Sequence, residues 1–231
     1  MSSSENNPVV LVHGWAGNFR DTWQKPGIDA LLDDIGRKVL PFNLLGHADQ
    51  DKPTDPSAYA ELPQWFLDHL PSEAPVIDAV GFSLGALTIL RALIQEPQRF
   101  GKVILAGIGD GVFTKSAPDA NKRIIDALEG NAPEEDELGR MFAHYGNQPG
   151  NDLAALTAIM KRPPSDPVDP MSLAAITNEV LVVIGEKDFT FPAEKLAAAF
   201  PNGRLVVLKN IDHFATPESF LFIDQILDFF A

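Results

Sequence analysis

The segment Gly81-Phe82-Ser83-Leu84-Gly85 contains the residue types that point most directly to chemistry. It follows an apolar run that ends at Phe82, and it precedes an apolar helical pattern that continues through Leu90 and Ile94. A serine on a tight turn between a strand and a helix is exposed above the edge of a sheet, and glycine on either side lets the two chain segments approach closely. The segment therefore predicts Ser83 as a catalytic nucleophile.

A serine hydroxyl is a weak nucleophile and needs a base within hydrogen-bond reach, which must itself be oriented. Of the five histidines, His213 has the position expected of this base, because it follows the last predicted strand and precedes the final predicted helix. Active sites of open parallel sheets form at the carboxyl ends of the strands, where this loop lies. The other histidines are predicted to fix loops (His13 and His47) or to lie on helix surfaces (His69 and His144).

Asp188 is the predicted partner of this base, because it follows the strand that ends near Ile184 and so lies at the same edge of the sheet. The order serine, aspartate, histidine is the order found when this triad is built on a hydrolase-type sheet. Asp110 competes for the role because it also follows a strand. Glu186 fits less well from the apex of the turn, and Asp212, next to the histidine, is expected to point away from the imidazole.

An oxyanion formed at Ser83 would need backbone amides as hydrogen-bond donors. One is expected from Leu84, at the positive end of the helix that follows the nucleophile. The other is expected from Trp15, in the loop His13-Gly14-Trp15-Ala16-Gly17, where Gly14 lets the backbone turn in closely. An apolar substrate pocket is predicted beside them, with a lining that includes Trp15, Phe82 and Phe214.

Short apolar runs alternate with longer amphipathic stretches along the chain, which is typical of parallel strands joined by helices. This pattern predicts an α/β fold with a mostly parallel, twisted sheet of about six strands. The expected strands are 9–13, 38–42, 76–82, 102–106, 180–184 and 204–208. The expected helices are 27–35, 57–70, 84–95, 193–200 and 217–230, with Pro63 kinking or splitting the second.

Residues 111–170 break this alternation, because they contain no strand-like run. Three helix-like segments, 119–129, 134–145 and 151–161, are followed by a proline-rich stretch. We interpret 111–170 as a helical cap inserted into a core domain made of 1–110 and 171–231. A long crossover packed against the flank of the sheet is the alternative.

Composition narrows the classes of partner. The 231-residue chain has a formal net charge of −14, which argues against binding to nucleic acid or to anionic membranes. It has no cysteine, no histidine pair at metal-ligand spacing and no dinucleotide-binding glycine motif, so we expect no metal and no cofactor. Neither a signal peptide nor a membrane-spanning run is visible, which predicts a cytoplasmic protein. The composition is compatible with a homo-oligomer.

Taken together, these motifs resemble the α/β-hydrolase fold family, and the similarity covers most of the chain. It rests on His13-Gly14-Trp15, on Gly46-His47, on the turn around Ser83, on Asp188 and on His213. The resemblance implies acyl transfer, in which the serine attacks, the histidine moves the proton, the aspartate orients it and the two amides stabilise the oxyanion. Family members usually begin with an antiparallel hairpin, and too few residues precede the first strand here to form one. A serine nucleophile argues against the dehalogenase and epoxide-hydrolase branches.

The expected function is that of a serine carboxylesterase acting on small or medium acyl esters, with a small-molecule ester as partner. Hydrolysis of a carbon–carbon bond in a ring-fission product is the main alternative, since enzymes of similar layout use the same triad. Lactonase, thioesterase and perhydrolase activities are not separated by sequence. A hydrolase-fold receptor that binds a ligand without turnover is the alternative from another class.

Overall fold

A computed structural model describes residues 6–117, 119–133 and 135–231. Its centre is a six-stranded sheet in the order β2-β1-β3-β4-β5-β6, and each neighbouring pair is parallel. The predicted fold class is confirmed, and each predicted strand is present. The strands are β1 (Val9–Val12), β2 (Val39–Phe42), β3 (Ile77–Phe82), β4 (Phe100–Ala106), β5 (Val180–Gly185) and β6 (Gly203–Leu208).

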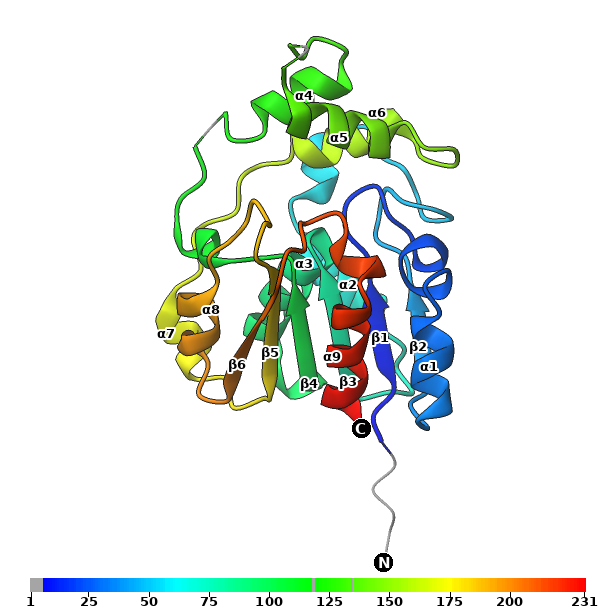
Figure 1. Cartoon of the computed structure of the whole chain (residues 1–231), viewed down its shortest axis with the longest axis vertical. Helices are drawn as coiled ribbons and strands as arrows, with labels where there is room; N and C mark the ends of the chain where they lie inside the picture. Colours follow the sequence, from blue (N-terminus) through cyan, green and yellow to red (C-terminus); the bar gives the residue numbers. More distant parts are fainter. Residues whose placement is uncertain (1–5, 118, 134) are drawn as a thin grey trace, which may run out of the picture.

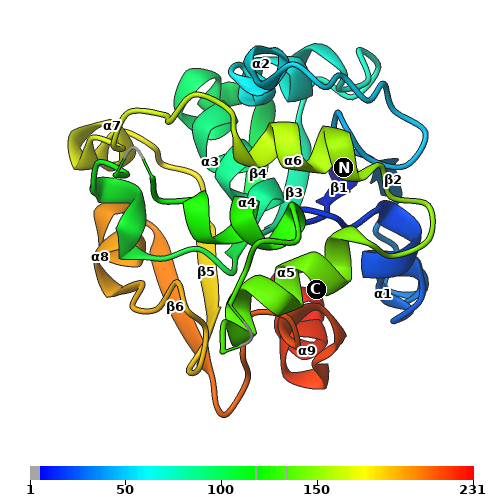
Figure 2. The ribbon, with the colours of Figure 1, turned by 90° about the horizontal axis from the view of Figure 1, so that it is seen from above.

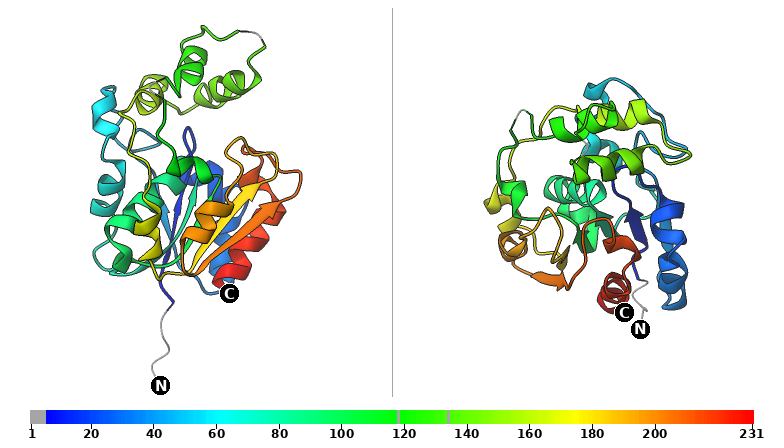
Figure 3. Two further views of the ribbon diagram at one scale, coloured as in Figure 1. Left: turned by 90° about the vertical axis from the view of Figure 1, so that its left-hand side faces the viewer. Right: turned by 45° about the horizontal axis from the view of Figure 1, so that its top comes forward.

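Helices cover both faces of this sheet (Figure 1; Figure 3, left). The helices α1 (Ile28–Asp34) and α9 (Phe220–Phe230) pack on one face, together with the π-helix Arg20–Gln24. The helices α2 (Leu62–Asp68), α3 (Leu84–Gln95) and α8 (Glu194–Ala199) pack on the other. Strands β1, β3 and β5 are buried along their whole length, which explains their continuous apolar runs. No helix in the described ranges is both long enough and apolar enough to cross a membrane.

The helix predicted for residues 57–70 is divided in two. A short 3-10 helix, Pro56–Tyr59, is followed by α2, which begins at Leu62 and carries Pro63 in its first turn. Proline is tolerated there because the first amides of a helix have no intrahelical acceptor. Two of the short elements that were not predicted are the π-helix Arg20–Gln24 and α7 (Pro170–Ala174). Each spans only five residues, too few for a helical period to appear in the sequence.

The segment between β4 and β5 carries α4 (Lys122–Leu128), α5 (Glu137–Gly146) and α6 (Leu153–Met160). These helices lie over the carboxyl edge of the sheet, as Figures 1 and 2 show. They share a small apolar cluster of their own, formed around Leu128, Phe142 and Met160. We call α4, α5 and α6 the cap helices. The predicted domain boundaries at 111 and 170 stay predictions, and the predicted helix start at Glu134 lies outside the described residues.

Candidate active site

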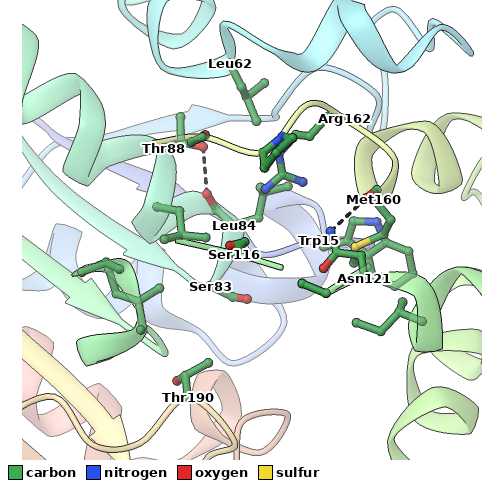
Figure 4. A pocket seen from close by; sticks show the side chains of 18 of the residues that line it. Trp15, Leu62, Ser83, Leu84, Thr88, Ser116, Asn121, Met160, Arg162 and Thr190 are labelled. Atoms are coloured by element: carbon green, nitrogen blue, oxygen red, sulfur yellow. Dashed lines mark hydrogen bonds between the residues drawn. The ribbon is translucent and has the colours of Figure 1, made fainter. Parts of the chain in front are cut away.

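Ser83 lies on the turn between β3 and α3 and has a positive φ of 52°. Two glycines permit this turn, because a Cβ atom at either would collide with neighbouring backbone. At Gly81 it would lie 2.7 Å from the amide nitrogen of Ala86, and at Gly85 it would lie 2.6 Å from the carbonyl oxygen of His13. The strained turn therefore holds the Ser83 hydroxyl above the carboxyl edge of the sheet, where it faces a cavity (Figure 4).

The structure brings Ser83, His213 and Asp188 together in one hydrogen-bonded chain. The Nε2 atom of His213 is 2.9 Å from the Oγ atom of Ser83, and its Nδ1 atom is 2.8 Å from Oδ2 of Asp188. Thr190 donates two further hydrogen bonds to Oδ1 of Asp188, one from its amide and one from its hydroxyl, each 2.8 Å long. This arrangement can move a proton from the hydroxyl to the imidazole.

The charge state of Asp188 follows from these contacts. Burial alone would raise the pKa of its carboxyl group, but the hydrogen bond and charge of His213, together with the bonds from Thr190, outweigh burial and lower that pKa. The group is therefore a carboxylate at neutral pH. A buried carboxylate beside Nδ1 holds the imidazole in one tautomer and stabilises the imidazolium that a proton transfer would create.

The other carboxylates considered for this role make hydrogen bonds elsewhere. Asp110 accepts a hydrogen bond from an amide in the first turn of α8, and Glu186 accepts one from the amide of Asn210. The carboxylate of Asp212 caps the turn that follows it. In the described part of the chain, no three His, Asp or Glu side chains lie close enough together to hold a metal ion.

The amides predicted as oxyanion donors belong to Trp15 and Leu84, on the two segments that meet at Gly85. Leu84 is the first residue of α3, so its amide has no acceptor within the helix. The Trp15 side chain is held by the cap helices: its Nε1 atom donates to the carbonyl oxygen of Leu156, 3.0 Å away, and its ring packs against Phe142. The loop that carries the Trp15 amide is thus fixed between the sheet and the cap helices.

His13 and His47 hold the same loop from below. Both rings are buried, and their centroids lie 4.8 Å apart. Their Nε2 atoms accept hydrogen bonds from the amides of Leu44 and Ala16, so each Nδ1 atom carries the proton and donates to a backbone carbonyl. Burial lowers the pKa of His13 to about 4 and that of His47 to about 3, with the neighbouring His13 adding to the second shift. Both rings are therefore neutral at pH 7. They fix loops through their hydrogen bonds, as the sequence predicted.

Comparison with known proteins agrees with this geometry. The model of the alpha/beta hydrolase family matches residues 9–222. The chain belongs to this family. A search of the curated proteins found no match.

Solved structures of similar fold include a marine microorganism esterase, with 19% sequence identity, a TM-score of 0.68, and coverage of 97% of this chain and 95% of that one. A meta-cleavage product hydrolase from Pseudomonas fluorescens IP01 has 17% identity and a TM-score of 0.66, and 98% of this chain and 91% of that one are covered. Est816, described as an N-acyl homoserine lactone degrading enzyme, has 20% identity and a TM-score of 0.67, with 98% and 94% covered. At these identities the similarity concerns the fold.

A cavity of about 990 Å³ opens above Ser83, between the sheet edge of this alpha/beta hydrolase and its cap helices. Trp15 lines it, as expected, whereas Phe82 and Phe214 do not. The Phe82 ring packs against the imidazole of the site, with centroids 4.9 Å apart, and Phe214 stacks on a tyrosine of α5. Phe189, which was not predicted, lines the cavity and lies 4.3 Å from the same imidazole.

The sequence reasoning also missed Thr190, which orients the carboxylate of Asp188. The signal was present in the spacing, because an aspartate often accepts hydrogen bonds from the backbone and hydroxyl two residues further on. Two arginines that line the cavity, Arg91 and Arg162, were not singled out either. No local pattern marks them, because only the packing of the cap helices over the sheet brings them to one cavity.

Proposed function

We propose that this member of the alpha/beta hydrolase family is a serine hydrolase, a carboxylesterase that cleaves small or medium acyl esters. The observation that carries the proposal is the chain of hydrogen bonds from the Ser83 hydroxyl through His213 to the Asp188 carboxylate. The Ser83 end of this chain of hydrogen bonds faces a cavity large enough for a small-molecule ester. Membership of a family of hydrolases supports the same reading.

In the first half of the reaction, the Oγ atom of Ser83 attacks the ester carbonyl carbon while its proton passes to Nε2 of His213. The carbonyl oxygen becomes an oxyanion, which the amides of Trp15 and Leu84 stabilise. His213 then gives the proton to the oxygen of the leaving group as the carbon–oxygen bond breaks. The alcohol departs, and the acyl group remains bound to Ser83 as an ester.

In the second half, a water molecule takes the place of the alcohol. His213 removes one proton from this water as its oxygen attacks the acyl carbon, and the same proton then returns to Ser83 when the acyl–enzyme bond breaks. The net reaction converts one ester and one water into one acid and one alcohol. The Asp188 carboxylate remains ionised throughout, and its negative charge compensates the imidazolium in each half.

The same chain of groups could start related reactions. The titles of the similar structures name an esterase, a meta-cleavage product hydrolase and an enzyme that degrades N-acyl homoserine lactones. We favour simple esters because the site needs nothing beyond the nucleophile, the base and the two amides to cleave them. Lactones, thioesters and dienone acids belong in the same substrate panel as competitors.

The proposal is tested by the hydrolysis of nitrophenyl acetate, butyrate and octanoate by the wild-type protein and by Ser83→Ala. We expect wild-type turnover and a loss of about 10⁴-fold or more in kcat in the variant. Ser172→Ala, on α7, is the matched control and is expected to retain wild-type rates. Equal residual rates in wild type and Ser83→Ala would remove Ser83 from the mechanism. Ligand binding without turnover in the wild type would favour a receptor instead.

A further inference from the structure

Two arginines face the cavity above Ser83. Arg162 follows the end of α6, and Arg91 lies on α3. In Figure 4 the Arg162 side chain extends into the cavity above Leu84. Its Nη1 atom donates to a backbone carbonyl oxygen 2.7 Å away, and Nη2 of Arg91 donates to the carbonyl oxygen of Asp166, also at 2.7 Å. A guanidinium has five N–H donors, so most donors of both groups remain available to a ligand.

Neither guanidinium forms a salt bridge within the ranges that the structure describes. Lys122 and Lys161, which line the same cavity, are by contrast paired with carboxylates, Lys122 with Asp126 on α4 and Lys161 with Glu129 directly after α4. The chain has 32 acidic residues for 18 lysines and arginines, so carboxylates are abundant. Most other lysines and arginines of the described residues also lack a salt bridge, so what distinguishes these two arginines is their place in the cavity above Ser83, where an anionic ligand can reach them.

The surrounding charges indicate how much negative charge the ligand should carry. Burial lowers the pKa of Arg162, and the charge of Arg91 lowers it further, because the two cations repel each other. Burial also lowers the pKa of Arg91, but the carboxylate of Asp166 acts in the opposite direction. Asp119, which also lines the cavity, lies near Lys122, and Glu61 lines a second, smaller cavity to which Arg91 also contributes.

Two guanidinium groups and one nearby carboxylate leave one positive charge at this end of the cavity. A single carboxylate matches that charge better than a phosphate dianion does. A guanidinium also presents two parallel N–H groups to a carboxylate, which makes such a pair both directional and strong. The lining of the same cavity also includes apolar residues, among them Leu84, Ile108 and Val112, which suit a hydrocarbon spacer.

We propose that the preferred substrates are esters that carry a second, free carboxylate, such as half-esters of dicarboxylic acids. Arg162, assisted by Arg91, binds the free carboxylate while the ester carbonyl lies at Ser83. This inference rests on the proposed function for its turnover assay and adds to it a class of substrate. It assigns Arg162 and Arg91 a role in substrate selection and none in the chemical step.

The first test compares two nitrophenyl esters of equal length, the half-ester of adipic acid and the neutral mixed ester in which the second carboxyl group is methylated. The wild type should show a higher kcat/KM for the half-ester. In Arg162→Gln the ratio of the two kcat/KM values should fall about 10- to 100-fold, the size expected for a hydrogen bond to a charged group, mainly through KM. Arg140→Gln, on the exposed side of α5, is the matched control and should keep the wild-type ratio.

A second test does not need turnover. Calorimetry would compare binding to Ser83→Ala with binding to the double variant Ser83→Ala, Arg162→Gln. Monomethyl adipate should bind the single variant about 10-fold or more tightly than the double variant. Dimethyl adipate should bind both variants equally. If no ester is hydrolysed but this difference appears, the proposed function fails, and only the assignment of Arg162 to carboxylate binding stands. If esters are hydrolysed but the ratio of kcat/KM values is the same in wild type and Arg162→Gln, the inference is overturned. Should Arg162→Gln not fold, Arg162→Lys and Arg91→Gln replace it, and an unchanged ratio in both overturns the inference.

Discussion

The close contact between the nucleophile turn and the first strand makes Gly85 a sharp point of perturbation. In Gly85→Ala the new methyl group would meet the carbonyl group of Val12, with the carbon 2.8 Å away, and the carbonyl oxygen of His13 at 2.6 Å. Nonbonded heavy atoms pack at about 3.5 Å, so the two backbone segments must separate by roughly 1 Å. These atoms belong to backbone, so no side-chain rotation relieves the collision.

The separation would move the two proposed oxyanion donors apart. The Leu84 amide lies directly before Gly85, and the Trp15 amide lies two residues after His13. A displacement of about 1 Å at a catalytic group costs on the order of 100-fold in rate. Overpacking a core position costs about 1 to 3 kcal/mol in the free energy of unfolding, which corresponds to a melting temperature lower by about 2 to 12 °C in a chain of this size. We therefore expect a folded, less stable protein with a strongly reduced kcat.

The assay combines thermal unfolding with the hydrolysis of nitrophenyl butyrate. Gly111→Ala is the matched control for stability, because a Cβ atom at Gly111 meets no atom within 4 Å and its φ is not positive. It should change the free energy of unfolding by less than about 0.5 kcal/mol. If Gly85→Ala folds and keeps its kcat within twofold of wild type, then the spacing of the Trp15 and Leu84 amides does not control the reaction, and the assigned donors are wrong.

Three further predictions follow from the same contacts. Asp188→Asn should lower kcat about 10⁴-fold in the esterase assay, because the imidazole loses its orienting carboxylate. Asp110→Asn affects only the start of α8, so it should leave kcat within about tenfold of the wild-type value. Lowering the pH from 6.5 towards 4 should reduce the free energy of unfolding, by up to roughly 1.4 kcal/mol per pH unit for each of His13 and His47. The reason is that these rings become protonated in the unfolded chain while they stay neutral in the folded protein. Urea unfolding should show this loss of stability, and the loss should be smaller in His47→Gln. Asp78→Ala should lower the free energy of unfolding in urea by about 3 to 5 kcal/mol, because it leaves the buried Arg37 without its ion-pair partner. The folded fraction should keep its kcat, since this pair lies at the edge of the sheet opposite to Ser83. A flat stability profile between pH 6.5 and 4, or an Asp78→Ala variant as stable as wild type, would contradict these assignments.

Local pattern in the sequence was enough to predict the elements and the turn that positions Ser83. Apolar runs of the right length marked the strands, and the glycines at 81 and 85 marked a turn that residues with side chains could not form. Chain order then brought His213 to the same edge of the sheet, because all strands of a parallel sheet end on one side. These features depend on near neighbours in the chain, so they are readable without a structure.

The tertiary structure decided between groups that the sequence could only rank. Asp188 and Asp110 both follow strands, yet only Asp188 contacts the imidazole, while Asp110 caps the first turn of α8. Phe82 and Phe214 stand next to residues of the site in the chain but pack away from the cavity, whereas Arg91, on α3, and Arg162, after α6, line it. Which side chain faces a cavity depends on how the cap helices pack over the sheet, and that packing is set by contacts between residues far apart in the sequence.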